Sequence, residues 1–341
     1  MLTRTLRVGC MLATDLRRSV MSMLTRRGAM KAAGLGVAGV AIGGLAGPSR
    51  AQEQVRSRKR ALRLAHLTDL HTQPELKAGE GVASCVAHVQ GHKDRPQLIL
   101  LGGDLVMDSF DSGDARTKEQ WDVFERAFKK ECRIPVDGCL GNHDIWGINK
   151  TKSKTTGNEP GWGKKRAMDI LGMSRAYKSF PMANWKFIML DSVMPQGESY
   201  IGKLDDEQWE WLDGELKGTD PNTPILVLSH IPILTATQLV QPAKKESKKR
   251  EIGDSLMMAD APRFVAAFAK YPNVKLCLSG HIHEIDRVEY QGVTYLCNGA
   301  VSGNWWKGRH KQCDEGYSLI DLFEDGTFEN TYVRYGWKAG S

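Results

Sequence analysis

The chain has 341 residues, enough for one large domain or two small ones with a full hydrophobic core. Its 47 Lys and Arg residues outnumber its 40 Asp and Glu residues, which gives a formal net charge of +7. The first 51 residues hold eight of the basic residues and one acid, so the remainder carries 39 of each sign. Overall charge therefore gives no support to a general polyanion-binding surface, and nucleic acid is not an expected partner.

The first 51 residues have the layout of an export signal. The pair Arg26 and Arg27 precedes a Gly-rich apolar stretch at 32–47, and a small residue, Ala51, marks a cleavage point. The paired arginines resemble a bacterial twin-arginine signal, which implies the twin-arginine export machinery as a partner and a periplasmic or extracellular location. The stretch is too short and Gly-rich for a membrane span, so we expect none in the mature form. Translation has three candidate starts: Met1, Met21 and Met23.

Residues 52–60 are polar and basic without periodicity, which predicts a linker. Residues 61–341 are predicted to form a single domain, in which alternating strands and helices indicate an α/β fold. Apolar runs predict strands at Leu62–Leu67, Gln97–Leu101, Val136–Leu140, Trp185–Leu190, Pro224–Leu228 and Val274–Leu278. Helical periodicity predicts helices at Gly81–Gln90, Thr117–Lys130, Asp205–Lys217 and Ala261–Lys270.

The last third of the chain changes character, because short strand patterns there alternate with turn signals. The patterns predict strands at Asp286–Tyr290, Val293–Asn298, Gly316–Phe323 and Thr327–Tyr335. We expect these strands to form a second, more antiparallel sheet packed on the first. Two basic insertions, at Lys150–Arg166 and Gln241–Arg250, are interpreted as solvated loops, with contact to a phosphate-bearing substrate as the alternative.

The sequence predicts the state of three cysteines but gives two alternative roles for three tryptophans. No C-x-x-C spacing occurs, and three cysteines lie in apolar strand-like runs, which favours buried free thiols at Cys139, Cys277 and Cys297. The indole rings of Trp146, Trp305 and Trp306 either wall a pocket and stack on a base or aromatic leaving group, or pack in the core.

Five short polar clusters each follow a predicted strand. They are Asp69-Leu70-His71, Gly103-Asp104, Gly141-Asn142-His143-Asp144, Ser229-His230 and Gly280-His281-Ile282-His283. A carboxylate or imidazole at the carboxyl end of a parallel strand points into the crevice where open α/β sheets bind ligands. Any single cluster is best explained by a structural histidine, but five together supply enough ligands for two metal ions. That number of ligands predicts hydrolysis by a metal-bound hydroxide.

The ordered set resembles the calcineurin-like metallophosphoesterase superfamily, whose signature is D-x-H, G-D, G-N-H-D, a lone His and G-H-x-H. The resemblance covers about residues 62–285 and implies a four-layer αββα sandwich of two mixed β-sheets flanked by helices. It implies that one metal ion is held by Asp69, His71, Asp104 and His283. The second ion would be held by Asp104, Asn142, His230 and His281. Without a cysteine ligand, Mn, Fe and Zn are the candidate metals.

The resemblance also implies a mechanism. His143 lies beside the ligand Asn142 without being a ligand itself, and it would protonate the leaving group. Asp144 would hold the tautomer of the His143 imidazole and raise its pKa. The alternative for His143 is a structural role behind the ligands.

The expected function is thus that of an exported dinuclear-metal phosphoesterase acting on small phosphate mono- or diesters. A cyclic-nucleotide phosphodiesterase or a nuclease on the same site remains open. So does a non-catalytic metal-binding module of the same fold.

Overall fold

The computed structural model describes residues 58–241 and 251–340. The expected export signal at 1–51 and nearly all of the basic insertion at 241–250 lie outside the described residues. Within the described ranges, no helix combines the length and the apolar character that crossing a membrane requires. The first strand begins at Arg60, one residue before the predicted start of the domain.

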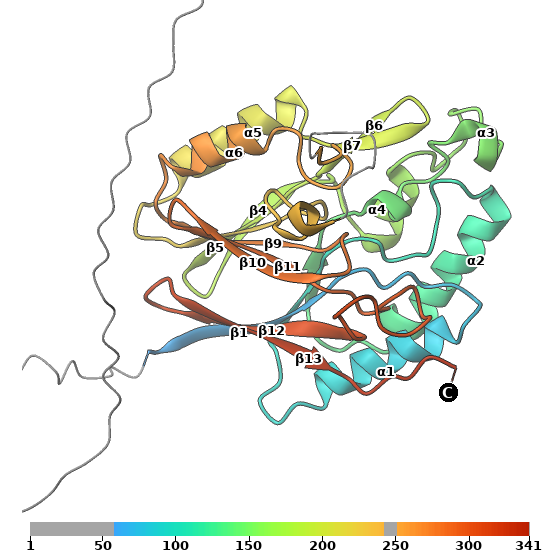
Figure 1. The fold of residues 1–341 in the computed structure, drawn as a ribbon, viewed down its shortest axis with the longest axis horizontal. Coiled ribbons are helices and arrows are strands. Elements are labelled where there is room, and N and C mark those ends of the chain that lie inside the picture. Colours follow the sequence, from blue (N-terminus) through green and yellow to red (C-terminus); the bar gives the residue numbers. More distant parts are fainter. Residues whose placement is uncertain (1–57, 242–250, 341) are drawn as a thin grey trace, which may run out of the picture. The chain divides into compact units, whose positions relative to one another are not determined.

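Two large sheets form the centre of the fold (Figure 1). One has five strands in the order β13-β12-β1-β2-β3: Phe328–Arg334, Gly316–Phe323, Arg60–Leu67, Leu98–Leu101 and Val136–Gly138. The other has six strands in the order β10-β11-β9-β8-β5-β4: Ile285–Tyr290, Val293–Asn298, Val274–Ser279, Ile225–Leu228, Trp185–Met189 and Lys178–Met182. A separate hairpin consists of β6 (Val193–Gln196) and β7 (Ser199–Gly202).

Both sheets contain a parallel set of strands; the six-stranded sheet is antiparallel at both edges, whereas the five-stranded sheet is antiparallel only where β12 and β13 pair. Strands β1, β2 and β3 run parallel, as do β5, β8, β9 and β11. Every residue of β2 and β8 is buried, which explains why both read as unbroken apolar runs rather than alternating patterns. All the carboxyl ends of a parallel set lie at one edge, so the loops after these strands are brought together.

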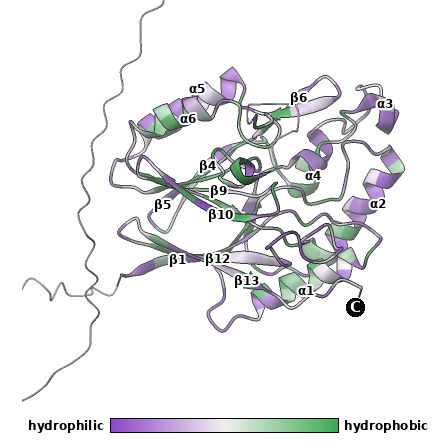
Figure 2. Cartoon of the chain, viewed as in Figure 1, coloured by the Kyte–Doolittle hydropathy of each residue, from purple (hydrophilic) through white to green (hydrophobic). Residues whose placement is uncertain are grey.

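Helices cover the outer face of each sheet and leave an apolar layer between the sheets. The five-stranded sheet packs on α1 (Ala78–Gln90), α2 (Asp114–Phe124) and a π-helical continuation of α2 (Glu125–Lys129). The six-stranded sheet packs on α5 (Asp206–Gly218) and α6 (Ala261–Phe268). Leucines such as Leu64 and Leu226 fill the space between the two sheets. The predicted αββα sandwich is confirmed, and Figure 2 shows hydrophobic residues on the inner strands and hydrophilic ones along much of α2.

The prediction for the last third of the chain is wrong in its pairing. Its four strands exist, but they do not form a sheet of their own. Strands β10 and β11 extend the six-stranded sheet through β9, whereas β12 and β13 extend the five-stranded sheet through β1. Local periodicity predicts a strand but carries no information about a partner that lies far away in the chain.

Several short elements escaped prediction. The insertion at 150–166, expected to be a solvated loop, contains α3 (Lys150–Ser153) and the start of α4 (Lys165–Leu171). Strand β4 was also missed, because it is a half-exposed edge strand that contains a proline and lacks clear alternation. Two short 3₁₀ turns complete the described elements, at Asn142–Asp144 and Thr237–Val240.

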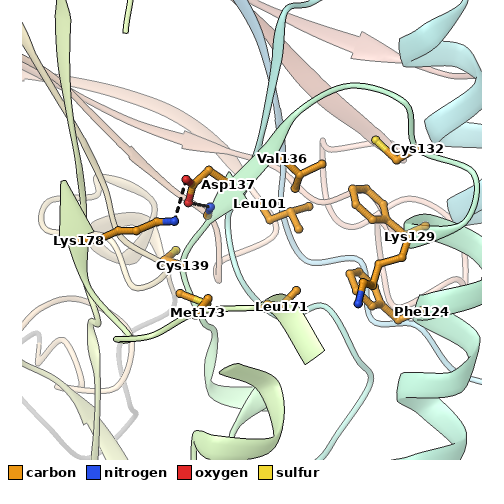
Figure 3. Close-up of a pocket in the computed structure, with 12 residues that line it drawn as sticks. Leu101, Phe124, Lys129, Cys132, Val136, Asp137, Cys139, Leu171, Met173 and Lys178 are labelled. Carbon is orange, nitrogen blue, oxygen red and sulfur yellow. Dashed lines mark hydrogen bonds and ion pairs between the residues drawn. The ribbon is translucent and has the colours of Figure 1, made fainter. Parts of the chain in front are cut away.

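The six described cysteines are free, and five of them are buried. The predicted free thiols at Cys139, Cys277 and Cys297 are therefore confirmed. Two cysteines border a cavity of about 240 Å³ between β3, the π-helical segment and β4 (Figure 3). Its wall combines apolar groups such as Phe128 with an ion pair of 2.8 Å between Lys178 and Asp137. None of the candidate site residues lines this cavity.

Candidate active site and metal centre

The five polar clusters converge where β1, β2, β3, β8 and β9 end. Two groups of three side chains each have their ligand atoms within 4.8 Å of one another: Asp69 with His71 and His283, and Asp104 with His230 and His281. A third group, His71 with Asp104 and His143, joins the two. The structure thus gathers residues from distant parts of the chain. Their assignment as metal ligands stays a prediction.

Backbone carbonyls fix the tautomers of three candidate ligands. His283 Nδ1 donates to Gly303 O at 2.6 Å, and His230 Nδ1 donates to Gly102 O at 2.7 Å. His281 is reversed, because its Nε2 donates to the carbonyl oxygen of Ser255 at 2.8 Å. A carbonyl can only accept a hydrogen bond, so each of these nitrogens carries the proton. The other nitrogen of each neutral ring then holds a lone pair that faces the site, as metal ligation requires.

The lone pairs face each other at short range. Nε2 of His71 lies 3.0 Å from Nε2 of His283, and Nδ1 of His281 lies 3.1 Å from Nε2 of His230. The oxygen Oδ1 of Asn142 also lies 3.1 Å from His230 Nε2. Electron pairs in this arrangement repel one another unless a proton or a cation lies between them. The donor set is made of nitrogen and oxygen without thiolate, so it fits the predicted Mn, Fe or Zn.

Asp104 lies between the two groups. Its Oδ2 is 3.2 Å from His230 Nε2 and 3.7 Å from His71 Nε2. Its Oδ1 accepts a hydrogen bond of 2.8 Å from the backbone N–H of His143. One oxygen is thereby anchored while the other faces both sets of ligands, which is the arrangement that a bridging carboxylate needs.

Asp69 is buried and strongly hydrogen bonded. Its Oδ2 accepts from Thr68 Oγ1 at 2.6 Å and from the backbone N–H of His281 at 2.9 Å. Burial raises the pKa of Asp69, but positive charge on the facing His283 and His230, carried as protons wherever no metal cation lies between these groups, outweighs this and lowers the pKa to about 2. The Asp69 side chain is therefore an anion ready to hold a cation.

Five of the seven candidate ligands adopt left-handed backbone conformations. Their φ angles are positive: 56° at Asp69, 43° at His71, 53° at Asp104, 71° at His281 and 57° at His283. Such values are uncommon outside glycine and cost roughly 1–3 kcal/mol each. They occur here where sharp turns after strands aim the side chains back over the sheet edge. Strain of this kind gathers at functional sites.

Two motif glycines have no room for a side chain. A Cβ on Gly141 would overlap Oδ1 and the backbone nitrogen of Asp104 and lie 2.8 Å from its Cγ. A Cβ on Gly280 would lie 2.9 Å from Cβ of Thr68 and against the carboxylate of Asp69. Any larger residue would displace a candidate ligand. The glycines of the G-N-H-D and G-H-x-H clusters are thus explained by close packing around the two carboxylates.

His143 lies at the accessible side of the site. Its ring is 4.8 Å from that of His71, its Nε2 is 4.0 Å from Asp104 Oδ2, and its side chain is 28% exposed. Nδ1 of His143 is buried and has no hydrogen-bond partner among the described residues. The ring is therefore close enough to reach a substrate held at the ligands, but no described protein group fixes its tautomer.

The predicted contact between Asp144 and His143 is wrong. The Asp144 carboxylate is fully buried and accepts hydrogen bonds from the backbone N–H groups of Leu105, at 2.7 Å, and Gly141, at 2.8 Å. Burial, together with the negative charge of Asp104, raises the pKa of Asp144 to about 7. Its side chain turns away from the neighbouring imidazole because it ties the loop after β2 to the loop after β3. Asp144 positions these loops rather than the His143 ring.

The residues that support the ligands could not be predicted from the sequence. Ser302 Oγ donates to Asp69 O at 2.7 Å, and the carbonyls of Gly102, Ser255 and Gly303 orient three histidines. Backbone carbonyls carry no residue-type signal, so no sequence pattern could have identified them. Of the three tryptophans, Trp146 and Trp306 are buried, whereas Trp305 is only partly buried and stacks on His283.

Comparisons with known proteins agree with this geometry. The chain is 28% identical over 278 residues to a probable cyclic nucleotide phosphodiesterase of Synechococcus sp., which covers 79% of this chain and 91% of that protein. It is 27% identical over 291 residues to a 3′,5′-cyclic-nucleotide phosphodiesterase of Nostoc sp., with 81% and 93% covered. A 3′,5′-cyclic adenosine monophosphate phosphodiesterase of Escherichia coli K12 is 23% identical, with 78% and 87% covered.

Solved structures show the same fold. A dimetal phosphatase from Danio rerio aligns with a TM-score of 0.53 and 13% identity, covering 82% of this chain and all of that one. The family model for calcineurin-like phosphoesterases matches residues 62–284, which contain all five polar clusters. The protein therefore belongs to the calcineurin-like phosphoesterase family and is a metal-dependent phosphoester hydrolase.

Proposed function

We propose that the protein hydrolyses small phosphate diesters, with 3′,5′-cyclic nucleotides as the favoured substrates. The observation that carries the proposal is the convergence of nitrogen and oxygen donors in two adjoining groups, with Asp104 Oδ2 3.7 Å from His71 Nε2 in one and 3.2 Å from His230 Nε2 in the other. The printed names of the Synechococcus and Nostoc relatives support the diester class. A nuclease would need a basic groove, and the charge balance after residue 51 speaks against one.

The proposed cofactors are two Mn, Fe or Zn ions. One would be held by Asp69, His71, Asp104 and His283, and the other by Asp104, Asn142, His230 and His281. When bound, the ions supply Lewis acidity toward phosphoryl oxygens and lower the pKa of water to near neutrality. The chain itself contributes lone pairs of fixed direction, a shared carboxylate and, at Asn142, a neutral oxygen that limits the negative charge.

His143 is the proposed proton donor to the leaving oxygen. It is the partly exposed histidine of the His71–Asp104–His143 group, and the hydrogen bond from its backbone N–H to Asp104 Oδ1 fixes its distance from the candidate ligands. Its Nδ1 has no hydrogen-bond partner among the described residues, so no described carboxylate orients the imidazole, and a bound substrate would have to orient it. General acid catalysis of this kind contributes about 10²- to 10⁴-fold to the rate.

Substitution His143→Asn tests this role. With 3′,5′-cyclic AMP, whose leaving group is an alkoxide, kcat is expected to fall by about 10²-fold or more. With bis-p-nitrophenyl phosphate the fall should be much smaller, because nitrophenolate leaves without a proton. His92→Asn, at a partly exposed histidine outside the site, is the matched control. If kcat fell by the same factor with both substrates, His143 would not be the proton donor to the leaving group. A wild type that hydrolyses neither diester after loading with Mn²⁺ or Zn²⁺ would remove the proposed function.

Export remains part of the proposal. The arginine pair and the apolar stretch that follows it support translocation by the twin-arginine machinery. An exported enzyme would act on small phosphate esters outside the cytoplasm. Replacing Arg26 and Arg27 together with Lys should leave the protein in the cytoplasm of its bacterial host. Detection of the same periplasmic amount by fractionation and blotting would contradict this assignment.

A further inference from the structure

Trp305 differs from the other two tryptophans near the site. The side chains of Trp146 and Trp306 are 2% and 1% exposed, and their indole N–H groups donate to backbone carbonyls. Trp305 is only partly buried, and its indole N–H makes no hydrogen bond to any described residue. Its ring nevertheless lies on a candidate metal ligand, 4.3 Å from the ring of His283 at an interplanar angle of 29°. An indole that is both open to solvent and adjacent to the centre is available to a substrate.

The loop that carries Trp305 is held rigidly against the first polar cluster. The indole N–H of Trp306 donates to the carbonyl oxygens of Leu70 and His71, at 3.1 and 3.0 Å. Ser302 donates from its hydroxyl to Asp69 O at 2.7 Å. These bonds hold both tryptophans at positive φ, 49° at Trp305 and 68° at Trp306, which is unusual for such large side chains. A strained conformation persists where its surroundings fix it, and such sites gather around binding and catalysis.

The face of Trp305 opposite His283 is not covered by another ring among the described residues. The other ring contacts of Trp305 are with His71, at 5.9 Å, and His310, at 5.7 Å and 87°. The ring centroids of His310 and His283 are 5.9 Å apart. If His310 lay on the opposite face of the indole, the indole would separate the two imidazoles and this distance would be much longer. The imidazole of His310 is therefore beside the indole, and no described ring stacks on the far face of this partly exposed side chain.

We infer that Trp305 is a specificity-determining residue whose indole stacks on the nucleobase of the substrate. The inference rests on the proposed function, because it requires a phosphate held at the neighbouring ligands. A phosphate near His71 and His283 places the rest of a nucleotide within reach of the adjoining indole. Stacking of a base on an aromatic side chain is tolerant of base identity, since every base has a π-face. The substrates are therefore nucleotides, and Trp305 distinguishes them from phosphate esters without an aromatic ring.

Binding by paired ligands separates this role from a structural one. AMP and ribose 5-phosphate share a sugar and a phosphate and differ by the base. Each is titrated into Mn²⁺-loaded protein by calorimetry. Trp305→Ala is expected to raise the Kd of AMP about 10-fold, equivalent to about 1.4 kcal/mol, and to leave that of ribose 5-phosphate unchanged. Trp305→Phe should retain most of the AMP affinity. Trp211→Ala, at a partly buried tryptophan that packs on Tyr177 of another face, is the matched control and should change neither.

Three outcomes would overturn the inference. The first is equal weakening of both ligands with loss of bound manganese, which would mean that Trp305 only supports His283. The second is unchanged AMP affinity in Trp305→Ala, and the third is wild type that binds both ligands equally. Hydrolysis of bis-p-nitrophenyl phosphate by the wild type, measured in parallel, keeps the two proposals apart. If the wild type hydrolyses this diester, any of these three results refutes the stacking of Trp305 on the nucleobase, while the proposed phosphodiesterase activity still stands.

Discussion

Replacing Gly141 with Ala should disable the site while leaving the fold intact. The backbone of Gly141 has φ −99° and ψ 175°, a conformation that alanine adopts freely. The effect therefore comes only from the new methyl group, which would overlap Oδ1 and the backbone nitrogen of Asp104 and lie 2.8 Å from its Cγ. Because nonbonded carbons pack at about 3.5–4.0 Å, Asp104 must move by about 1 Å, and the contact with its nitrogen means that its backbone must move together with the shared carboxylate. Asp104 is the side chain that both proposed metal sites need.

The size of the effect follows from this displacement. Overpacking of a tight interior costs about 1–3 kcal/mol of unfolding free energy, which a domain of this size survives. A misplacement of about 1 Å at a reacting centre costs about 10²-fold in rate. We expect kcat/KM for bis-p-nitrophenyl phosphate to fall by about that factor, and the metal content to fall below that of the wild type.

The assay combines metal analysis, steady-state kinetics and urea unfolding. Gly214→Ala is the matched control, because no atom lies within 4 Å of its new methyl group in the exposed face of α5. This control should keep full activity and gain about 0.5–1 kcal/mol, since alanine restricts the unfolded chain. A Gly141→Ala protein with wild-type metal content and wild-type kcat/KM would refute the close-packing argument.

Two further predictions concern the same region. Asp144→Asn should lower the unfolding free energy by about 1–3 kcal/mol, because an amide nitrogen would face the N–H of Leu105 or Gly141 in place of an acceptor. An unchanged midpoint in urea would contradict the loop-tying role of Asp144. Removing metals with EDTA should lower Tm, because the opposed lone pairs of His71 and His283 then lack a cation, and added Mn²⁺ or Zn²⁺ should restore it. Identical melting curves with and without metal would count against the centre.

The sequence alone predicted most of the central strands and the polar clusters that follow them, and its resemblance to a known family supplied the αββα architecture and the candidate ligands. Completely buried parallel strands such as Leu98–Leu101 and Ile225–Leu228 appear as apolar runs, so their positions could be predicted. The polar clusters directly after such runs are local features as well. Since parallel strands end at a common edge, the convergence of these clusters follows from the order of strands and polar residues along the chain.

Only the tertiary structure decided how the distant parts meet. The division of β10–β13 between two sheets depends on which edges are free, and no local pattern encodes that. The side chain of Asp144 had two possible partners, the His143 imidazole beside it and backbone amides 39 residues away in sequence, and the burial of the loop selected the amides. The same holds for Trp305 and Trp306, neighbours of one residue type. Their opposite environments result from the left-handed turn that carries them, which directs one indole into the core and the other onto His283.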